Sequence, residues 1–575
     1  MPPTAIGAEH LIRILILSNL FPPAHIGGYE LRCSEVADRW QRRGHAVRVL
    51  TSRYPGDLSA ANPQPQPTAV DVRRLLGIGW GPPYPCDSLV EMLRAEAADR
   101  ATLSAELRSF APDVVSVWGM EFASQPLVHA LFRSNAPLHA TIEDIWLLNA
   151  FERDPLCHTR EMLDALAVSI PGEVRSLLNL GCERPDSRPV DISFSSDALA
   201  RRYEEGGFRS AGSQVLRAGI DLKLFRDNRR WNAPARAHGP LRVLFVGLAS
   251  EQRGVIDLAT AAAAARQRGT LVELRIVGAC AEPMRQRIRD VCGAGGVAVR
   301  FDGPLDAEAV CDAMAESDVL CAPSRLPEGL PRVLMEAMAA GLPIIATDGG
   351  AQPEIVQSEF GGQLLRPGDC DALMGAIHRA GVDRAGMRRL AAAGRAYALR
   401  DFDIDRYAER LEASLHATAE RHACRGGIRR RQFDGGAADP PVAEAVLRDL
   451  ALRAGRAAEA TAPAAVRRAD ATELWRLGVL LKRSGRTGAA RKVLLALVER
   501  FGSAGAALRR AALHLGELAL AEGDFATAAR WLRACLETTP DHARAHHDLA
   551  CAESGRMPAH LMIDASEQGG ARRAS

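Results

Sequence analysis

The sequence predicts an α/β protein in which two Rossmann-like domains face a cleft, followed by an all-α region of helical repeats. Three observations predict this class. Two series of short, β-branched apolar runs each alternate with longer amphipathic stretches, a pattern typical of parallel β-α-β units. A polar segment at residues 226–240 separates the two series. Beyond residue 441 the apolar pattern changes to that of consecutive helices.

Ten apolar runs are candidate strands, five in each series. Their near-continuous Val, Ile and Leu content suits strands that are buried on both faces of a parallel sheet. Crossovers between such strands are right-handed, and ligands bind at the carboxyl ends of the strands. The predicted strands are 13–18, 46–52, 113–118, 138–142 and 191–196 in the first domain, and 241–247, 272–278, 297–303, 318–324 and 342–348 in the second.

The first domain has a clear beginning. After its first strand, Gly27 and Gly28 predict a flexible loop, and a helix is expected from about Glu30. Apolar residues at helical spacing predict that this helix buries Val36, Ala37 and Trp40. Gly44 is expected to end the helix as the glycine that follows its C-cap.

Composition shifts divide the rest of the chain. Residues 396–420 read as a helical segment that completes the two-domain unit, and a Gly-, Pro- and Arg-rich stretch reads as a linker. The expected units are a first Rossmann-like domain at 1–225, a second at 226–395, the helical segment at 396–420, a linker at 421–441, helical repeats at 442–556 and a tail at 557–575.

The helical region contains an internal repeat. "LGVLLKRSGRTGAARKVL" (477–494) matches "LGELALAEGDFATAARWL" (515–532) at its Leu-Gly, Gly and Ala-Ala positions, and Leu549-Ala550 opens a third unit. This resembles the tetratricopeptide pattern, in which small residues let paired helices pack closely. An ordinary Ala/Leu-rich helical bundle is the alternative. A stack this short is expected to need contacts with the domains before it or with another subunit.

Composition limits the environment of the protein. The net charge is +2, so no overall positive field indicates nucleic acid. The 12 cysteines form no C-x-x-C pair, which predicts reduced thiols and a cytoplasmic protein. The apolar runs fall short of the roughly 18–20 residues that span a bilayer, and the N-terminus is predicted to be a strand instead of a signal peptide. At most, a peripheral contact at the inner face of the membrane stays open.

Two glutamates with seven residues between them, Glu328 and Glu336, stand in "PEGLPRVLMEAMAAGLP" (327–343). Pro331 suits the first turn of a helix, whose free N–H groups and dipole attract an anion, and Gly329 would let that anion approach. An ionised Glu336 repels phosphate but accepts hydrogen bonds from the vicinal hydroxyls of a ribose. The pattern therefore predicts a ligand of base, ribose, diphosphate and sugar, with Glu328 facing the sugar. The alternative is an ordinary helix with Glu336 solvated.

Several motifs occur in order along residues 11–415: "ILSNLFPPAHIGGYE", "RRGHAVRVLT", "VLRAGIDLKLF", "VLFVGLASEQRGVIDL", "EGLPRVLMEAMAAGLPIIATDGGAQPEIV" and "GGQLLRPGDCDAL". Together they resemble the retaining glycosyltransferases of the GT-B fold, specifically family 4, the glycosyl transferases group 1. The resemblance implies that the first domain takes the acceptor side and the second binds the nucleotide-sugar donor.

By this resemblance, Glu336 holds the donor ribose and Glu328 contacts the transferred sugar. The backbone at 329–330 would face the phosphates, and the loop at 27–28 would close on the diphosphate and sugar. The residues it assigns to donor binding are Glu336, Arg253, Gly27, Gly28, Gly329, Leu330 and Gly247.

The chain departs from the family pattern after the first strand of the second domain. Family members usually carry an Arg and a Lys five residues apart, and here these positions hold Leu248 and Arg253. Arg253 keeps the charge and can grip phosphate in a bidentate manner, whereas Leu248 cannot. The diphosphate would then lack one cation, for which Arg325 or Arg332 are candidate replacements.

A second departure lies in the first domain, where relatives often have His-Asp and this chain has Glu143-Asp144. An ionised Glu143 only accepts hydrogen bonds, unlike a neutral imidazole. It could pair a basic acceptor, be protonated through burial, or mark reduced activity. Asp144 either takes part in catalysis or is a satisfied loop carboxylate. The catalytic candidates are therefore Glu328, Asp144 and Glu143.

The resemblance implies sugar transfer from a nucleotide-diphosphate sugar, with retention of configuration, no metal and no other cofactor. The acceptor would be a glycan, a lipid-linked molecule or a small molecule in polysaccharide or glycoconjugate biosynthesis. The D-x-D triplets at 369–371 and 403–405 are explained by helix capping instead of metal binding. One alternative is a catalytically weakened scaffold that binds a protein partner through its repeats. Another is an epimerase or phosphorylase of the same architecture.

Overall fold

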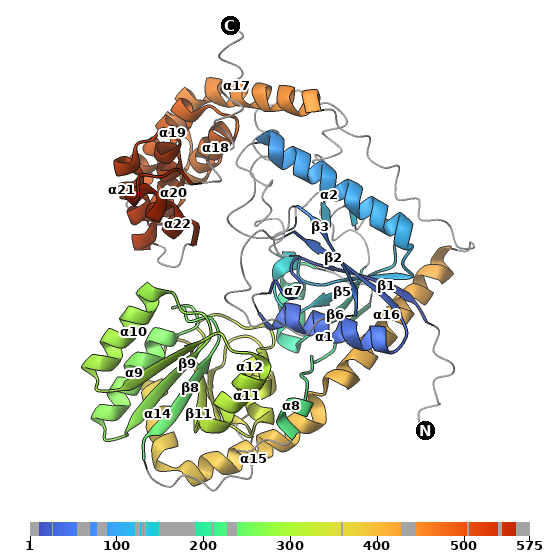
Figure 1. Cartoon of the computed structure of the whole chain (residues 1–575), viewed down its shortest axis with the longest axis vertical. Coiled ribbons are helices and arrows are strands. Elements are labelled where there is room, and N and C mark those ends of the chain that lie inside the picture. The colour runs from blue at the N-terminus through green and yellow to red at the C-terminus, as the bar shows by residue number, and fades with distance from the viewer. Residues whose placement is uncertain are drawn as a thin grey trace.

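The computed structural model describes residues 11–25, 27–53, 69–77, 89–120, 123, 127–128, 130–131, 134, 136–148, 190–208, 212–226, 239–357, 360–426, 444–502, 505–538 and 543–558. Two parallel sheets flanked by helices confirm the two predicted Rossmann-like domains, and a helical C-terminal region follows them (Figure 1).

The first sheet has seven parallel strands in the order β3-β2-β1-β4-β5-β6-β7. Its strands are β1 (Arg13–Ser18), β2 (Ala46–Ser52), β3 (Asp71–Leu76), β4 (Val114–Val117), β5 (Leu138–Ile142), β6 (Asp191–Phe194) and β7 (Gly212–Val215). All five predicted strands are present. The two strands that were not predicted, β3 and β7, are the edge strands, and their half-exposed sequences DVRRLL and GSQV lack the apolar signal of a buried strand.

The second sheet has six parallel strands in the order β10-β9-β8-β11-β12-β13. Its strands are β8 (Leu241–Val246), β9 (Val272–Val277), β10 (Ala298–Gly303), β11 (Val319–Ala322), β12 (Ile344–Thr347) and β13 (Gly362–Leu365). The strand order reverses between β1 and β4 in the first sheet and between β8 and β11 in the second. Ligands of such sheets bind beyond the carboxyl ends of the strands at these switch points. The loop that ends at Gly27 follows β1, and the loops with Arg253 and Glu328 follow β8 and β11.

Helices cover the two sheets. The first of them, α1 (Gly28–Arg42), buries Val36, Ala37 and Trp40 as predicted, and Gly44 follows it with a φ of +99°. The other helices of the two domains are α2 (Leu89–Phe110), α7 (Asp197–Glu205), α8 (Lys223–Arg226), α9 (Val255–Gln267), α10 (Glu282–Ala294), α11 (Ala307–Glu316), α12 (Arg332–Ala339), α13 (Gln352–Ile355), α14 (Cys370–Val382), α15 (Arg384–Asp401) and α16 (Ile404–Gly426).

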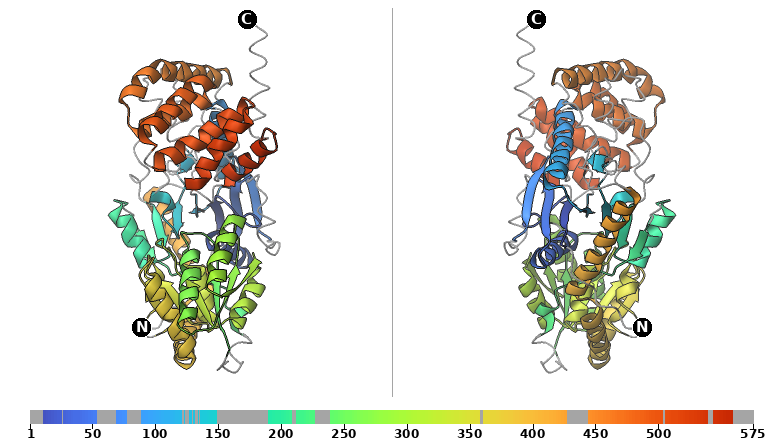
Figure 2. Two further views of the ribbon diagram at one scale, coloured as in Figure 1. Left: turned by 90° about the vertical axis from the view of Figure 1, so that its left-hand side faces the viewer. Right: turned by 90° about the vertical axis from the view of Figure 1, so that its right-hand side faces the viewer.

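The last helix of this unit, α16, returns from the second domain to the first, as Figures 1 and 2 show. There the indole Nε1 of Trp40 donates to the carbonyl of Ala408 at 3.1 Å, and Thr418 donates to the Asp191 carboxylate at 2.8 Å. Because α16 packs against α1 while its chain continues from α15, it ties the two domains together.

The C-terminal region consists of α17 (Glu444–Arg468), α18 (Ala471–Arg483), α19 (Thr487–Phe501), α20 (Gly505–Ala521), α21 (Phe525–Thr538) and α22 (Ala543–Glu553). The same kind of contact occurs in two helix pairs, α18–α19 and α20–α21. A Cβ added to Gly478 of α18 would lie 2.6 Å from Leu494 of α19, and a Cβ added to Gly516 of α20 would lie 2.7 Å from Leu532 of α21. The repeated glycines therefore allow the same close approach in both pairs.

The C-terminal helices also pack against the first domain. One apolar cluster joins Leu89 and Leu93 of α2 to Leu450 of α17 and to core residues of α18, including Leu477. Figure 1 shows α17 lying across one end of α2. The expected contact between the short helical stack and the preceding domains is therefore present.

Candidate functional site

The two-glutamate segment lies where β11 ends and α12 begins. Pro331 has a φ of −63° and a ψ of 114°. It is the N-cap that precedes α12, whereas it was predicted to lie inside the first turn of the helix. Among the described residues, no side chain caps this helix end, and the first turn carries no acidic residue. The N–H groups that begin α12 are therefore suited to an anion.

The carboxylate of Glu328 is held by two donors. Its Oε1 accepts hydrogen bonds from Arg253 and, at 2.7 Å, from the hydroxyl of Ser324. Its backbone is fixed as well, because the N–H of Ala351 donates to the Glu328 carbonyl at 2.9 Å. The preceding Gly350 has a φ of +68°, and a side chain there would collide with that carbonyl. The structure thus brings Glu328 and Arg253 together, and their roles toward sugar and diphosphate stay predictions.

Glu336 does not point into bulk solvent, since its side chain is only 14% exposed. Its Oε1 accepts a hydrogen bond from Nε of Arg332 at 2.6 Å. The same guanidinium donates from Nη1 and Nη2 to the two carboxylate oxygens of Glu35 on α1, at 2.9 and 2.7 Å. These two carboxylates raise the pKa of Arg332 further above its usual range, although burial opposes the shift. Glu336 is therefore linked to the first domain through one arginine.

Glycines let the two domains approach each other closely. A Cβ on Gly28 would stand 3.1 Å from Cβ of Arg332, and a Cβ on Gly329 would collide with the carbonyl oxygen of Glu143. Leu330 is buried in the core that both domains share. Gly329 therefore makes room for a neighbouring main chain in this structure, which corrects the expectation that its missing side chain admits an anion. Contact of the 329–330 backbone with a diphosphate stays a prediction, as do such contacts of Gly27 and Gly247.

Glu143 is directed toward Arg32 of α1. The two buried side chains form an ion pair, and Arg32 also donates to the carbonyl of Gly219 at 3.1 Å. Burial raises the pKa of Glu143 to about 7, an effect that Arg32 opposes and Asp144 adds to. Of the three options open for Glu143, pairing with a basic acceptor is the one this geometry disfavours, because a residue of the protein already occupies that role.

Asp144 is a largely satisfied loop carboxylate. Its Oδ1 accepts a hydrogen bond from the N–H of Trp146 at 2.8 Å, the geometry of a helix cap. Burial raises the pKa of Asp144 to about 6, although that hydrogen bond opposes the shift. The structure therefore favours a positioning contact for Asp144 over direct chemistry, and its catalytic role stays a prediction.

Neither candidate for the replacement cation is free. Arg325 forms a bidentate pair with Asp257 at 2.7 and 2.6 Å, and Arg332 is held by Glu35 and Glu336. Arg253 is 47% exposed, and Leu248 is 55% exposed. The position that holds an arginine in the family therefore presents an open apolar side chain here.

Several contacts at and near the candidate site escaped sequence reasoning. Ser324 beside Glu328 and Glu35 beside Arg332 carry no motif of their own. Glu354 of α13 accepts hydrogen bonds from the N–H groups of Asp197 and Ala198 at 2.9 and 2.6 Å, and so joins the second domain to the beginning of α7. Glu354 stands inside the quoted "AQPEIV" motif, but its partner lies 157 positions away. Only the folded chain reveals such pairs.

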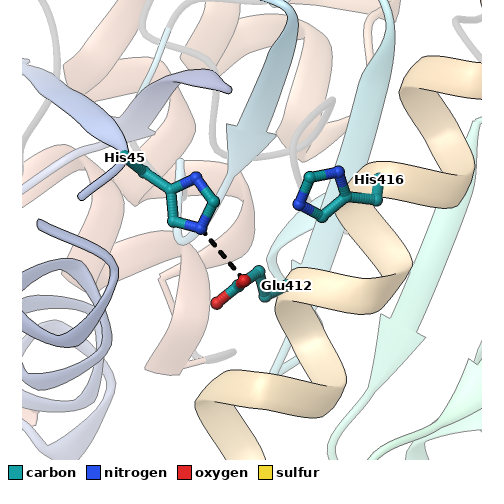
Figure 3. A group of neighbouring side chains, drawn as sticks. All are labelled: His45, Glu412 and His416. Atoms are coloured by element: carbon teal, nitrogen blue, oxygen red, sulfur yellow. Dashed lines mark ion pairs between the residues drawn. The ribbon is translucent and has the colours of Figure 1, made fainter. Parts of the chain in front are cut away.

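One group among the described residues has the spacing of a metal site: His45, Glu412 and His416 (Figure 3). Nδ1 of His45 accepts a hydrogen bond from the N–H of Ile12 at 3.2 Å, so the ring proton is on Nε2, 3.0 Å from Glu412. A metal on Nε2 would displace that proton to Nδ1, where it would face the Ile12 donor. Arg43, 2.8 Å from Glu412, adds positive charge. The group is therefore explained as a structural contact between the beginning of β2 and α16.

The predicted helix-capping role of Asp369 is confirmed, since its side chain accepts a hydrogen bond from the N–H of Ala372.

In the part of the chain that the structure describes, no helix combines the length and the apolar content that crossing a bilayer requires.

Comparison with known proteins gives consistent findings. Residues 240–381 match the protein-family model described as Glycosyl transferases group 1. The phosphatidyl-myo-inositol mannosyltransferase of Mycobacterium leprae is 35% identical over 361 residues, which cover 61% of this chain and 83% of that protein. The amylovoran biosynthesis glycosyltransferase of Erwinia amylovora is 28% identical over 196 residues, 33% of this chain and 47% of that protein.

Similarity to a solved structure supports the architecture. Sucrose-phosphate synthase from Thermosynechococcus elongatus matches with a TM-score of 0.53 at 20% identity, over 72% of this chain and 100% of that chain. At this identity the likeness shows a GT-B-like fold. Against three curated relatives, the chain spans 47%, 44% and 50% of their length, about half in each case.

Proposed function

Because this chain belongs to the glycosyl transferases group 1 family, we propose that it transfers a sugar from a nucleotide-diphosphate sugar to an acceptor. The transfer retains the anomeric configuration and needs no metal ion. Within the family we assign the chain to family 4. The M. leprae relative is a mannosyltransferase by name and the E. amylovora relative acts in amylovoran biosynthesis, which supports a role in polysaccharide or glycoconjugate assembly.

One observation carries this proposal: Glu328 and Glu336 flank the uncapped end of α12 at the switch point of the second sheet, and each is held by an arginine. Both carboxylates accept hydrogen bonds from an arginine, and a carboxylate also forms strong hydrogen bonds with hydroxyl groups. The helix end between them favours the diphosphate. A ribose at Glu336 and a sugar at Glu328 would then lie on either side of the phosphates.

We assign the stabilisation of negative charge on the leaving diphosphate to Arg253 and to the N–H groups that begin α12. Fixed donors of this kind act at the moment the charge develops and need no reorganisation. Closure of the two domains would exclude water and align the acceptor. No protein nucleophile is proposed, and Glu328 is assigned to orienting the transferred sugar.

The acceptor is proposed to be a glycan, a lipid-linked molecule or a small molecule on the first-domain side. The helix pairs α18–α19 and α20–α21, with their matched glycines, support tetratricopeptide-like repeats, and we assign them to a protein partner. A cytoplasmic location, with at most peripheral membrane contact, stays a prediction.

The rival function is a scaffold without catalytic activity. The exposed Leu248 and the buried Glu143 are the observations that favour it. They are outweighed by the intact Glu328–Arg253 and Glu336–Arg332 pairs, because a scaffold has no need to keep two arginine-bound carboxylates at a helix end. An epimerase or phosphorylase of this architecture would not be expected to keep this order of motifs.

A nucleotide panel tests the proposal. UDP, GDP, ADP and their sugars are added singly in a thermal-shift assay, where a ligand at about 100 times its Kd adds about 2.7 kcal/mol of stability. The responding donor is then used in a hydrolysis assay with Glu336→Ala. The matched control is Glu282→Ala, since Glu282 is an exposed acid of the same domain. Loss of binding and hydrolysis in Glu336→Ala alone is expected. Absence of any response from the native chain would overturn the proposal and favour the scaffold.

A further inference from the structure

Arg332 is the one described side chain that contacts both Glu336 and a carboxylate of the other domain. It lies on α12, largely buried, and gives both Nη groups to Glu35 and its Nε to Glu336. Glu35 belongs to α1 of the first domain, two turns after the Gly27–Gly28 loop. The contact with Glu35 therefore exists only while the domains are together, whereas the contact with Glu336 lies within one helix.

The surroundings of Arg332 fix its position. Gly28 leaves space for the aliphatic part of the side chain, since a Cβ there would stand 3.1 Å from Cβ of Arg332. The charge of Arg332 also acts on its neighbours, lowering the pKa of His25 and opposing the raised pKa of Glu143, although burial is the largest influence on both. The guanidinium is therefore surrounded by groups of the first domain.

Two arrangements of Arg332 follow from this geometry. With Glu35 in place, the hydrogen bond to Glu336 uses a single N–H and a single carboxylate oxygen. Without Glu35, both Nη groups lose their partner, and a guanidinium readily binds a carboxylate four residues along its helix through two parallel hydrogen bonds. That second arrangement would occupy both oxygens of Glu336, the atoms that a ribose needs.

We propose that Glu35, Arg332 and Glu336 form a relay that couples closure of the two domains to binding of the donor ribose. When the domains close, Glu35 binds the Nη groups of Arg332, so that only Oε1 of Glu336 keeps a hydrogen bond from Arg332 and Oε2 can accept from the ribose hydroxyls. When they open, Arg332 returns to Glu336 and competes with the ribose. Arg332 is thus a positioning residue for Glu336. The relay rests on the proposed function, because it needs the ribose at Glu336.

A second contact between the domains provides a matched control. The carboxylate of Glu354 accepts two backbone N–H groups at the beginning of α7 and lies 3.8 Å from Arg217. It joins the domains as Glu35 does, but none of its recorded contacts involves Arg332 or Glu336. Glu354→Gln therefore makes closure less favourable, but in the closed state Arg332 is still held by Glu35, whereas Glu35→Gln removes that partner.

Discrimination between ribose and deoxyribose tests the relay. The native chain, Glu35→Gln, Glu35→Asp and Glu354→Gln are titrated by calorimetry with the nucleoside diphosphate that the panel identifies and with its 2′-deoxy form. One charge-assisted hydrogen bond to the 2′-hydroxyl is expected to give the native chain about tenfold preference for the ribose form. Glu35→Gln should lose most of this preference, Glu35→Asp should recover part of it, and Glu354→Gln should keep it.

A double-mutant cycle separates the relay from a direct contact of Glu35 with the ligand. In an Arg332→Gln background, Glu35→Gln should change the Kd no further, because the group that it controls is absent. Additive effects would overturn the relay, and so would full ribose preference in a Glu35→Gln variant whose circular dichroism is native. If Arg332→Gln fails to fold, Arg332→Lys replaces it, since one ammonium cannot bridge both carboxylates. A native chain that binds no nucleotide would overturn the proposed function together with the relay, whereas the other outcomes concern the relay alone.

Discussion

Arg253 donates a hydrogen bond to the carboxylate of Glu328 across the loops that follow β8 and β11. The two residues stand 75 positions apart and come from different motifs, yet they meet at the switch point of the second sheet. Ser324 shares the same carboxylate oxygen at 2.7 Å. The pair therefore links the cation assigned to the leaving diphosphate with the carboxylate assigned to the sugar.

Replacing Arg253 should mainly slow the chemical step. Loss of one fixed donor to a developing oxyanion costs about 10²–10³ in kcat, and this range is expected for Arg253→Gln in the donor-hydrolysis assay. Arg253→Lys should stay within about tenfold of the native rate, because it keeps the positive charge. Arg242→Gln is the control, since Arg242 forms a bidentate pair with Asp318 at the other end of β8. Equal rates for Arg253→Gln and the native chain would remove Arg253 from the mechanism.

Restoring a cation at Leu248 should strengthen donor binding. Leu248 is 55% exposed, so Leu248→Arg places its charge in solvent without a burial penalty. An added charge-assisted contact with the diphosphate is expected to lower its Kd about tenfold, or ~1.4 kcal/mol, in calorimetric titration. As a control, Leu271→Arg adds the same charge at a similarly exposed leucine. Leu271 precedes the amino end of β9, whereas Leu248 follows the carboxyl end of β8. The prediction is wrong if both variants change the Kd equally.

The stability of the chain should depend on pH through Glu143. Burial raises its pKa from 4.5 to about 7, so the folded state holds a proton that the unfolded state releases between these values. The contribution of Glu143 is therefore fully present below about pH 4.5 and is lost as the pH rises through about 7. At about 1.4 kcal/mol per pKa unit, the loss is at most about 3.5 kcal/mol.

Thermal unfolding of the native chain and of Glu143→Gln between about pH 5 and pH 7.5 measures this effect. The glutamine stays neutral and its side-chain oxygen can still accept a hydrogen bond from Arg32. The Tm of the native chain should fall relative to that of the variant as the pH rises. A difference in Tm that is constant across this range would show that Glu143 does not titrate there.

Sequence reasoning predicted those features of the fold that depend on short local patterns. Strands buried on both faces were found from their Val, Ile and Leu runs, and the Glu328–Glu336 segment was found because both residues belong to one short motif. Edge strand β7, with its sequence GSQV, was missed because a strand that is half exposed needs no apolar run. Local pattern also could not predict that Gly329 faces the carbonyl of Glu143.

Contacts between distant residues were beyond sequence reasoning. The Arg332–Glu35 pair joins residues 297 positions apart, and neither charge differs in its local sequence from a solvated one. The same holds for Arg32, whose burial opposite Glu143 depends on how α1 packs. In the helical region, by contrast, the matched Leu-Gly positions of the sequence fall where paired helices approach closely, at Gly478 and Gly516.

A side chain at Gly516 should loosen the α20–α21 pair. In Gly516→Ala, the new Cβ would stand 2.7 Å from Leu532, so either this leucine or the helix spacing must change. Overpacking of this kind costs about 1–3 kcal/mol, measured by denaturant unfolding of the full chain. In Gly488→Ala, the new Cβ has no neighbour within 4 Å in the described structure and should leave stability unchanged or slightly higher. Equal destabilisation by both changes would contradict the close approach.

Replacing Glu517 should destabilise the helical region more than replacing an exposed acid there. It is 1% exposed on α20, accepts a hydrogen bond from Lys482 of α18 at 2.6 Å and lies 2.7 Å from Arg544 of α22. The approach of Arg544 is an ion pair without hydrogen-bond geometry. These cations hold the pKa of Glu517 well below its usual range, so its contribution is present above about pH 4.5 and is lost as the pH falls. The carboxylate therefore links three helices that are not consecutive in the chain.

Glu517→Gln removes the negative charge that two largely buried cations share, and breaking a buried ion pair from one side typically costs about 3–5 kcal/mol. Hydrogen exchange in the full chain should show this loss as easier opening of α18, α20 and α22. The control is Glu522→Gln, because Glu522 pairs with Arg491 while 42% exposed, and an exposed pair contributes only about 0–1 kcal/mol. Comparable protection in both variants would mean that the three helices are held by their apolar contacts alone.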